Sequence, residues 1–209
     1  YRSLVKESFA ELSQGEVTAT NILTRLLRLS QLTGGFIGND ETAAVEQVSA
    51  AKLAVLEDIL DSAIQEERKL VIIARFLPEI RAISRLIEKK GVRYSIITGA
   101  VKNRDEQVAL FQSDPEVPVF IGQIATAGLG ITLTAASTMI FYSLDYSMSN
   151  YEQTKARIHR VGQRMPCTYI HLVARQTVDE KVLRALGSKA DLAKTLVDDY
   201  RSGLNPFAS

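Results

Sequence analysis

Short apolar runs alternate with amphipathic segments of helical period over most of this chain. The runs span residues 70–74, 94–97, 117–121, 139–142 and 168–173. Pro78 and Gly91 begin and end the helical segment between the first two runs, as these residue types commonly do. Such alternation is typical of βαβ units, whose strands form a parallel sheet between helices. The sequence therefore predicts an α/β fold with three layers, a parallel sheet flanked by helices.

The two ends of the chain differ from this central part. Five leucine or isoleucine side chains at helical spacing (Ile22, Leu23, Leu26, Leu27 and Leu29) predict a helix that stops at Gly34-Gly35. Residues 36–42 have the composition of a turn or loop, and a second helix is expected to begin near Ser49. We therefore predict an N-terminal helical extension over 1–48, the α/β lobe over 49–190, and a C-terminal helix and tail over 191–209.

Composition restricts the classes of protein that remain. With 46% hydrophobic and 23% charged residues, the chain has the profile of a globular protein. The 25 basic and 24 acidic residues nearly cancel, so any nucleic-acid surface must be a local patch. The single cysteine, Cys167, excludes an internal disulfide and favours an intracellular protein, cytoplasmic or, in a eukaryote, nuclear. No apolar run of about 18 residues predicts a membrane span, and the start at Tyr1 suggests a fragment of a longer protein, expected to be monomeric.

A glycine-containing loop follows the third predicted strand. Gly128 and Gly130 allow the backbone to approach a ligand closely, and Thr126 and Thr132 supply hydroxyls of the kind that bind phosphate oxygens. The alternative is a tight turn before a short helix, with the threonines as caps.

The segment after the fourth predicted strand carries Gln153, Arg157 and Arg160 at positions 0, 4 and 7. On a helix this spacing places all three on one face. Two aligned guanidinium groups suit the spread negative charge of a phosphoryl-transfer transition state, whereas the alternative is a solvated basic face. Because the two loops follow successive strands, we expect both to open at the same edge of the sheet.

Together these segments resemble the second RecA-like lobe of superfamily-two helicases, specifically that of Swi/Snf-type DNA translocases. That family has a Thr-x-Ala-Gly-x-Gly-Leu-x-Leu loop and a Gln-x-x-x-Arg-x-His-Arg-x-Gly-Gln helix. Residues 126–133 fit the first with small departures, and residues 153–163 fit the second at every fixed position. The resemblance spans nearly all of residues 20–190 and is closest in character to phage and prokaryotic members.

The resemblance implies a role for each matching residue. Arg157 and Arg160 would be arginine fingers that reach the γ-phosphate of ATP, and His159 between them a structural bridge. The residues implied on the nucleotide side are Gln153, Gly128 and Gly130. The residues implied to contact DNA are Thr98, Arg104 and Thr126, together with Tyr146.

One departure concerns the loop after the fourth strand. Where the family usually has Asp-Trp-Asn-Pro, this chain has Asp145-Tyr146-Ser147-Met148, so the shape of that loop is open. Tyr142 and Tyr146 could equally be ordinary aromatic residues at a strand end. For Arg75, at the end of the first strand, a solvated position is the alternative to a functional one.

The chain lacks half of an ATPase site. It has no Gly-x-x-x-x-Gly-Lys-Ser/Thr loop and no Asp-Glu-x-His/Asp box, and we predict no metal site in it. The resemblance therefore implies that ATP with Mg²⁺ is bound mainly by an N-terminal RecA-like lobe of the same polypeptide, and that the intact enzyme acts on double-stranded DNA. Two alternatives are a non-catalytic nucleic-acid-binding module and an RNA helicase lobe, although the Gln-x-x-x-Arg-x-His-Arg spelling argues against the latter.

Overall fold

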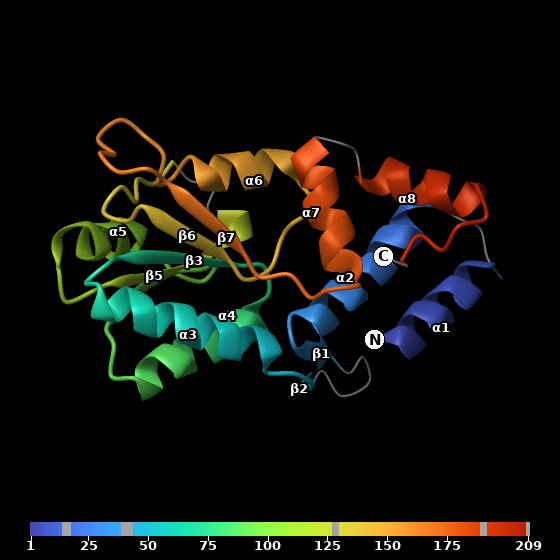
Figure 1. The fold of residues 1–209 in the computed structure, drawn as a ribbon, viewed down its shortest axis with the longest axis horizontal. Coiled ribbons are helices and arrows are strands. Elements are labelled where there is room, and N and C mark those ends of the chain that lie inside the picture. Colours follow the sequence, from blue (N-terminus) through green and yellow to red (C-terminus); the bar gives the residue numbers. More distant parts are fainter. Residues whose placement is uncertain (14–17, 39–43, 127–129, 189–191, 208–209) are drawn as a thin grey trace. The chain divides into compact units, whose positions relative to one another are not determined.

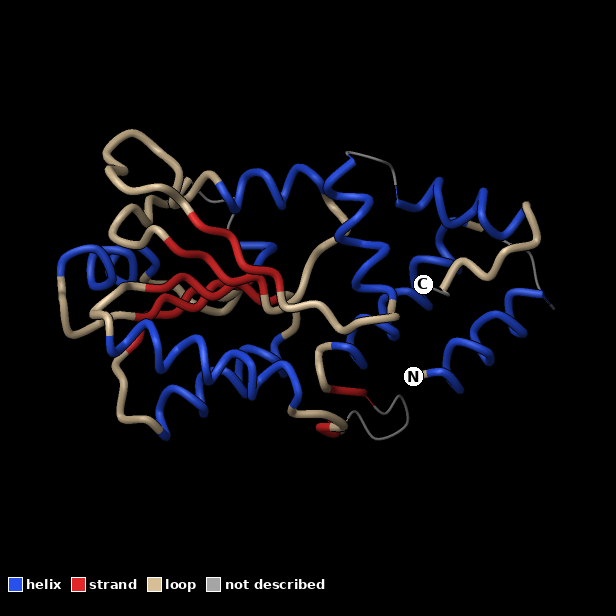
Figure 2. Tube along the Cα trace, in the orientation of Figure 1, coloured by secondary structure: helices blue, strands red, loops and turns tan. Residues whose placement is uncertain are grey.

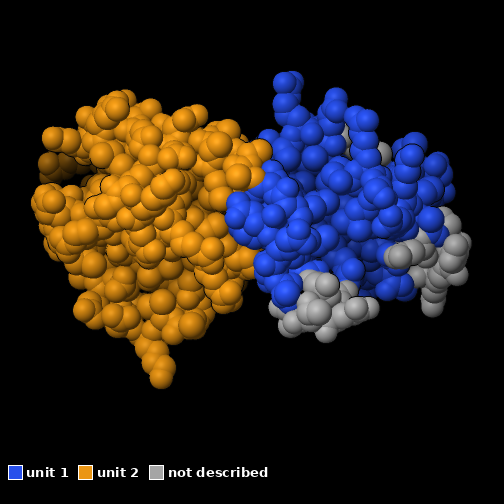
Figure 3. All heavy atoms as spheres, turned by 90° about the horizontal axis from the view of Figure 1, so that it is seen from below, with its two compact units in different colours: residues 1–49, 173–209 blue, residues 50–172 orange. Residues whose placement is uncertain are grey.

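A computed structural model describes residues 1–13, 18–38, 44–126, 130–188 and 192–207. The chain divides into two compact units, shown in Figure 3. Unit 1 comprises residues 1–49 and 173–209, and unit 2 comprises residues 50–172. The predicted lobe reaches residue 190, whereas the structure groups residues 173–190 with the N-terminal helices. The hydroxyl of Thr33 donates to Asp179 at 2.7 Å, which joins these two segments.

Unit 2 is built on a five-stranded parallel sheet, coloured red in Figure 2. Its strands are β3 (Leu70–Ala74), β4 (Tyr94–Ile97), β5 (Val119–Gln123), β6 (Thr138–Phe141) and β7 (Thr168–His171). Their spatial order is β4-β5-β3-β6-β7, so β3 is central, with Ile72 opposite Ile121 on one side and Ile140 on the other. The predicted parallel sheet is confirmed: β3 and β4 have the predicted boundaries, and those of the other three strands are shifted by one or two residues.

Helices cover both faces of this sheet (Figure 1). On one face, α3 (Ala51–Gln65) and α4 (Leu77–Lys89) bury Leu60 and Ile83 against the sheet. On the other face, α5 (Arg104–Ser113) and α6 (Met148–Lys155) place aromatic rings on the strands. The ring centroids of Phe111 and Phe120 are 5.5 Å apart, and those of Tyr151 and Phe141 are 5.2 Å apart. The three-layer α/β prediction is therefore confirmed.

Unit 1 holds four helices in its described part: α1 (Arg2–Ser13), α2 (Ala19–Thr33), α7 (Val178–Ser188) and α8 (Leu192–Arg201). It also holds two short antiparallel strands, β1 (Phe36–Gly38) and β2 (Val45–Gln47). The sequence predicted a turn or loop over residues 36–42, which include β1, and no strand at β2. Gly35 makes this pairing possible, because its φ is +95° and an added Cβ would lie 2.4 Å from the carbonyl oxygen of Ser49. No helix in the described ranges is long and apolar enough to cross a bilayer.

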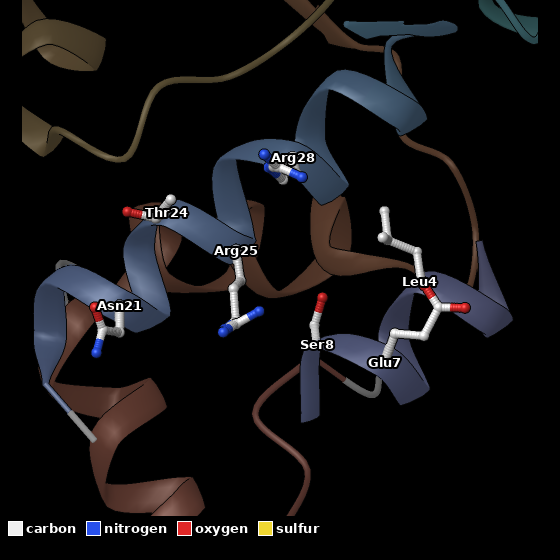
Figure 4. Close-up of a pocket in the computed structure, with 7 residues that line it drawn as sticks. All are labelled: Leu4, Glu7, Ser8, Asn21, Thr24, Arg25 and Arg28. Carbon is white, nitrogen blue, oxygen red and sulfur yellow. The ribbon is translucent and has the colours of Figure 1, made fainter. Parts of the chain in front are cut away.

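A cavity of about 360 Å³ lies between α1 and α2 in unit 1. Figure 4 shows the side chains of Arg25 and Ser8 directed into the space between the two helices. Its lining combines two arginines with one carboxylate and several neutral side chains: Leu4, Glu7, Ser8, Asn21, Thr24, Arg25 and Arg28. The cavity is therefore lined by both positively and negatively charged side chains.

A buried carboxyl group fixes the beginning of α4. Glu79 is 0% exposed, and its Oε2 accepts from the hydroxyl of Ser143 at 2.5 Å and from the Phe76 N–H at 3.1 Å. The Ser143 hydroxyl oxygen in turn accepts from the Arg75 N–H at 2.8 Å, so one carboxyl group ties the end of β3 to the end of β6. Burial raises the pKa of Glu79 to about 7, although these hydrogen bonds and the charge of Lys52 oppose the shift.

This shift makes the stability of the protein depend on pH. The folded chain holds the Glu79 proton up to a pKa of about 7, whereas the unfolded chain releases it near 4.5, so stability falls as pH rises between these values. We expect Glu79→Gln, which stays neutral, to lose this dependence and to gain roughly 3 kcal/mol relative to the natural protein between about pH 4 and pH 8. Urea unfolding across this range measures the difference, and parallel curves for both proteins would contradict it.

Candidate functional site

The two predicted finger arginines lie in a loop rather than on a helix. Helix α6 ends at Lys155, so Gln153 is helical while Arg157 and Arg160 belong to the following turns. The prediction of one shared helical face is therefore wrong. The main-chain carbonyl oxygen of Arg157 accepts from the Leu133 N–H at 2.9 Å, so its hydrogen bond goes to the 130–137 segment and not to an N–H of a further helical turn. We call residues 156–167 the arginine loop.

Arg160 contacts the predicted glycine-containing segment directly. Its Nη1 donates to the carbonyl oxygens of Gly130 at 3.0 Å and Ile131 at 3.4 Å, and to the Thr132 hydroxyl at 3.1 Å. The φ of Gly130 is +73°, a left-handed conformation that favours glycine. All three bonds use Nη1, so within the described ranges Nε and Nη2 of Arg160 have no partner. The structure thus joins the two segments that the sequence singled out, while Gly128 lies outside the described residues.

Arg157 is buried without a compensating charge. The residue is 8% exposed, and its Nε has no hydrogen-bond partner among the described residues. In the same part of the chain neither Arg157 nor Arg160 forms an ion pair. Burial, and secondly the positive charge of Arg160, lowers the pKa of Arg157. Because a buried charge is costly without a partner, this pair of guanidinium groups favours a bound anion.

The arginine loop lies where the strands begin. Helix α6 starts beyond the carboxyl end of β6, and the loop leads from its last turn to the first residue of β7 (Figure 1). The expectation that both motifs open at the carboxyl edge is therefore wrong for the arginines. They meet Gly130 because residues 130–137 lead from the end of β5 back to the start of β6.

Gln163 holds the arginine loop in place. Its Nε2 donates to the carbonyl oxygens of Ala136 at 2.8 Å, Ile158 at 3.2 Å and Thr134 at 3.3 Å. Its Oε1 accepts from the Met165 N–H at 3.0 Å. No role was predicted for this residue from the sequence. The signal that could have indicated one is that Gln163 is the last fixed position of the 153–163 match.

The carboxyl ends of β3, β4 and β5 form a second surface, which carries two of the predicted DNA contacts. Thr98 follows β4 and is 8% exposed. Thr126, in the short helix η1 (Ile124–Thr126), is half-buried, and its hydroxyl donates to the carbonyl oxygens of Gln123 at 2.8 Å and Ile97 at 3.4 Å. The structure therefore brings the ends of β4 and β5 together, with both threonines packed against protein.

Gln123 connects three strand ends at this edge. Its Oε1 accepts from the Gly99 N–H at 3.2 Å, beyond β4, and its Nε2 donates to the Arg75 carbonyl oxygen at 3.3 Å, beyond β3. This role was not predicted, because an isolated glutamine at a strand end gives no signal of its own in the sequence.

Arg75 and Tyr146 form a stacked pair at the same edge. The Arg75 guanidinium carbon lies 4.0 Å from the Tyr146 ring centroid, and its Nη2 is 3.8 Å from Oδ1 of Asp145. The Arg75 side chain is 19% exposed, so the structure excludes the solvated alternative. Ser147 caps α6 by accepting from the Asn150 N–H at 3.2 Å, which gives the loop a defined shape without the family's Asn-Pro.

Two other singled-out residues make local contacts, and a third, His159, is exposed. The Nε of Arg104 donates to the Val101 carbonyl oxygen at 3.1 Å and braces the turn before α5. Gln153 is exposed and donates to the Ser149 hydroxyl at 3.0 Å, one helical turn earlier. In the described part of the chain it has no hydrogen bond to either finger arginine, and His159 is exposed in the loop rather than bridging a helix.

Within the described ranges, no three His, Cys, Asp or Glu residues cluster as metal ligands would.

Residues 51–162, more than half of the chain, match the helicase conserved C-terminal domain. The chain therefore belongs to the family of helicase C-terminal domains. Its fold is that of SWI2/SNF2 ATPases: the Sulfolobus solfataricus SWI2/SNF2 ATPase core in complex with dsDNA matches with a TM-score of 0.77 and 22% identity, over 100% of this chain and 46% of that one. The separate C-terminal domain of that ATPase matches with a TM-score of 0.67 and 22% identity, over 90% of this chain and 78% of that one.

Relatives of similar sequence are longer proteins. An uncharacterized ATP-dependent helicase of Mycoplasma pneumoniae is 30% identical over 86% of this chain and 17% of its own length. Helicase SWR1 of Yarrowia lipolytica is 30% identical over 73% of this chain and 9% of its length. The chromatin-remodeling ATPase INO80 of Cryptococcus neoformans is 32% identical over 72% and 9%. The chain thus spans less than a fifth of these relatives, and the resemblance to Swi/Snf-type lobes is confirmed.

The contact between Arg75 and Tyr146 can be measured. We expect Arg75→Gln and Tyr146→Leu to destabilise the chain singly, and their effects to fall short of additivity by about 1 kcal/mol in the double variant, because a cation–π pair can be lost only once. Urea unfolding of the four proteins gives the coupling energy, and strict additivity would show that the stack contributes nothing.

Proposed function

We propose that this chain is the C-terminal motor lobe of an ATP-dependent, Swi/Snf-type DNA translocase. The observation that carries the proposal is the pair Arg157 and Arg160, two neighbouring guanidinium groups without a carboxylate partner in the described ranges, beside Gly130. Phosphate oxygens of ATP are the anion that such a pair suits best, because guanidinium groups bind phosphate in a bidentate geometry.

The arginines would act as fingers on a site completed by another lobe. During phosphoryl transfer, negative charge spreads over the oxygens of the transferred group, and cations placed there beforehand stabilise the transition state. Mg²⁺, when bound with ATP, neutralises charge on the phosphates. The sequence contains neither the phosphate-binding loop nor the acidic box, so we assign these to an N-terminal RecA-like lobe of the same polypeptide.

The carboxyl edge of the sheet would track along a DNA backbone. It carries the exposed Gly99 and Lys102 next to Thr98 and Thr126, whose side chains are packed against protein in this structure, and Arg104 braces the turn before α5. Hydroxyls, backbone N–H groups and cations bind phosphate without selecting sequence, as a translocase requires. Tyr146 supplies an aromatic ring at the same edge, and double-stranded DNA is the partner we propose.

We expect Arg157→Ala and Arg160→Ala in the intact enzyme each to reduce DNA-stimulated ATP hydrolysis by roughly 10³-fold while ATP binding is largely spared, because the fingers act mainly in the transition state. Steady-state hydrolysis and nucleotide titration separate the two effects. Arg164→Ala, an exposed arginine of the same loop, is the matched control and is expected to retain activity. Wild-type turnover in either finger variant would remove that arginine from the site.

The isolated chain of residues 1–209 should not hydrolyse ATP measurably, with or without duplex DNA, because the phosphate cradle and the metal ligands belong to the other lobe. Turnover by this chain at a rate comparable to the intact enzyme would overturn the divided site. Salt-sensitive DNA binding by the intact protein without any hydrolysis would identify a binding module instead, and stronger stimulation by single-stranded RNA than by duplex DNA would identify an RNA helicase.

A further inference from the structure

Gln123 and Gln163 are both half-buried, one on each of the two surfaces of unit 2. The side-chain amide of each forms hydrogen bonds with the backbone of different segments. We propose that Gln123 is the positioning residue of the DNA-tracking edge and Gln163 that of the arginine loop, so that each controls a different kinetic parameter of the motor. This inference rests on the proposed function and extends it to Gln123, which lies outside both family motifs, and to Gln163, a fixed position of the second motif to which the resemblance gave no role.

Gln123 lies where the backbone hydrogen bonds between the strands of the sheet end. It is the last residue of β5, the strand between β4 and β3, and beyond it the ladder ends. Its amide oxygen accepts from the Gly99 N–H, beyond β4, and its amide nitrogen donates to the Arg75 carbonyl oxygen, beyond β3. One side chain therefore connects β5 to both neighbouring strands where the backbone bonds between them have ended. The Thr126 hydroxyl binds the main chain of the same residue.

The consequence is that Gln123 sets the spacing between the loops that would meet phosphates. Without its amide, the Gly99 N–H and the Arg75 carbonyl oxygen lose their partner and must turn toward water, which moves the turn that carries Thr98 relative to Thr126. Neither change touches the arginine loop, which lies where the strands begin. Loss of Gln123 should therefore weaken DNA engagement and leave the chemical step unaffected.

Gln163 acts on the other surface by the same means. Its amide nitrogen faces three carbonyl oxygens, two from residues 134–136 and one from Ile158, which lies between the two finger arginines. The bond to Ile158 therefore fixes the part of the arginine loop that separates Arg157 from Arg160. Because a displacement of about 1 Å can cost on the order of 10² in rate, loss of this bond should reduce turnover.

The experiment compares Gln123→Met and Gln163→Met in the intact enzyme, since methionine keeps the length of the side chain and removes the amide. ATP hydrolysis is measured at saturating ATP against the concentration of a duplex DNA, which gives kcat and the half-saturating DNA concentration. We expect Gln123→Met to raise the half-saturating concentration about fivefold to tenfold with kcat within about twofold. We expect Gln163→Met to lower kcat about tenfold or more with half-saturation within about twofold.

Gln112→Met is the matched control. The Gln112 side chain also ties an element to the 134–136 segment, through the Ala135 N–H at 2.8 Å and the Thr134 hydroxyl at 3.2 Å, but it does not bond to the arginine loop. We expect it to lower the melting temperature as the other variants do and to move neither kinetic parameter. Titration of DNA at high protein concentration gives the competent fraction of each variant, so kcat can be corrected for misfolded material.

Gln163→Glu adds a second test of the same contact. It keeps the shape of the side chain but turns a carboxylate oxygen toward three carbonyl oxygens, so kcat should fall below that of Gln163→Met. A kcat at the wild-type level in this variant would contradict the assigned contact.

The outcomes separate this inference from the proposed function. If Gln123→Met and Gln163→Met shift the same parameter, or neither shifts one, while Arg160→Ala abolishes hydrolysis, the positioning roles are wrong and the motor assignment stands. If Arg157→Ala and Arg160→Ala both retain wild-type hydrolysis, the proposed function itself fails. If Gln123→Met changes only the half-saturating DNA concentration and Gln163→Met changes only kcat, the result supports both the positioning roles and the proposed function.

Discussion

The burial of β3 on both faces is the constraint on which the rest of unit 2 depends. All five residues of Leu70–Ala74 are at most 1% exposed, so helices must cover both sides of the strand, and α3 with α4 and α5 with α6 provide that cover. A parallel strand covered in this way leaves only its two ends for ligands. The two candidate surfaces of the lobe lie at these two ends, and the chemistry of each is carried by the connections between strands.

Much of this fold could be predicted from the sequence, because apolar runs and helical periods carry information within a few residues. The strand at 70–74 and the helix before Gly91 are examples. The pairing of β1 with β2 could not be predicted, since residues 36–42 have the composition of a loop and the pairing depends on Gly35, which allows a backbone approach that any side chain would block. The end of α6 at Lys155 could not be predicted either: just beyond it the Arg157 carbonyl oxygen accepts from the Leu133 N–H, a partner that no local pattern reveals.

The candidate site shows the same division. Arg157, Arg160 and Gly130 could be found because they belong to a spaced pattern, although their placement in a loop could not be. Gln123 gave no signal, and Arg75 could not be decided between a solvated and a functional position, since the role of each depends on partners that the fold brings from distant segments. A guanidinium at a strand end is solvated by default, and only the position of Tyr146 makes it part of a stacked pair.

That stacked pair gives the ring of Tyr146 two unequal sides. The Arg75 guanidinium carbon lies 4.0 Å from the ring centroid, so one face of the ring is covered by a cation of the same chain. A positive charge over one face of an aromatic ring draws electron density toward itself and makes the other face less repulsive to an electron-rich partner. Tyr146 is therefore an aromatic ring whose polarisation is set by a fixed cation of the same chain, so its affinity for an electron-rich group depends on Arg75 as well as on the ring itself.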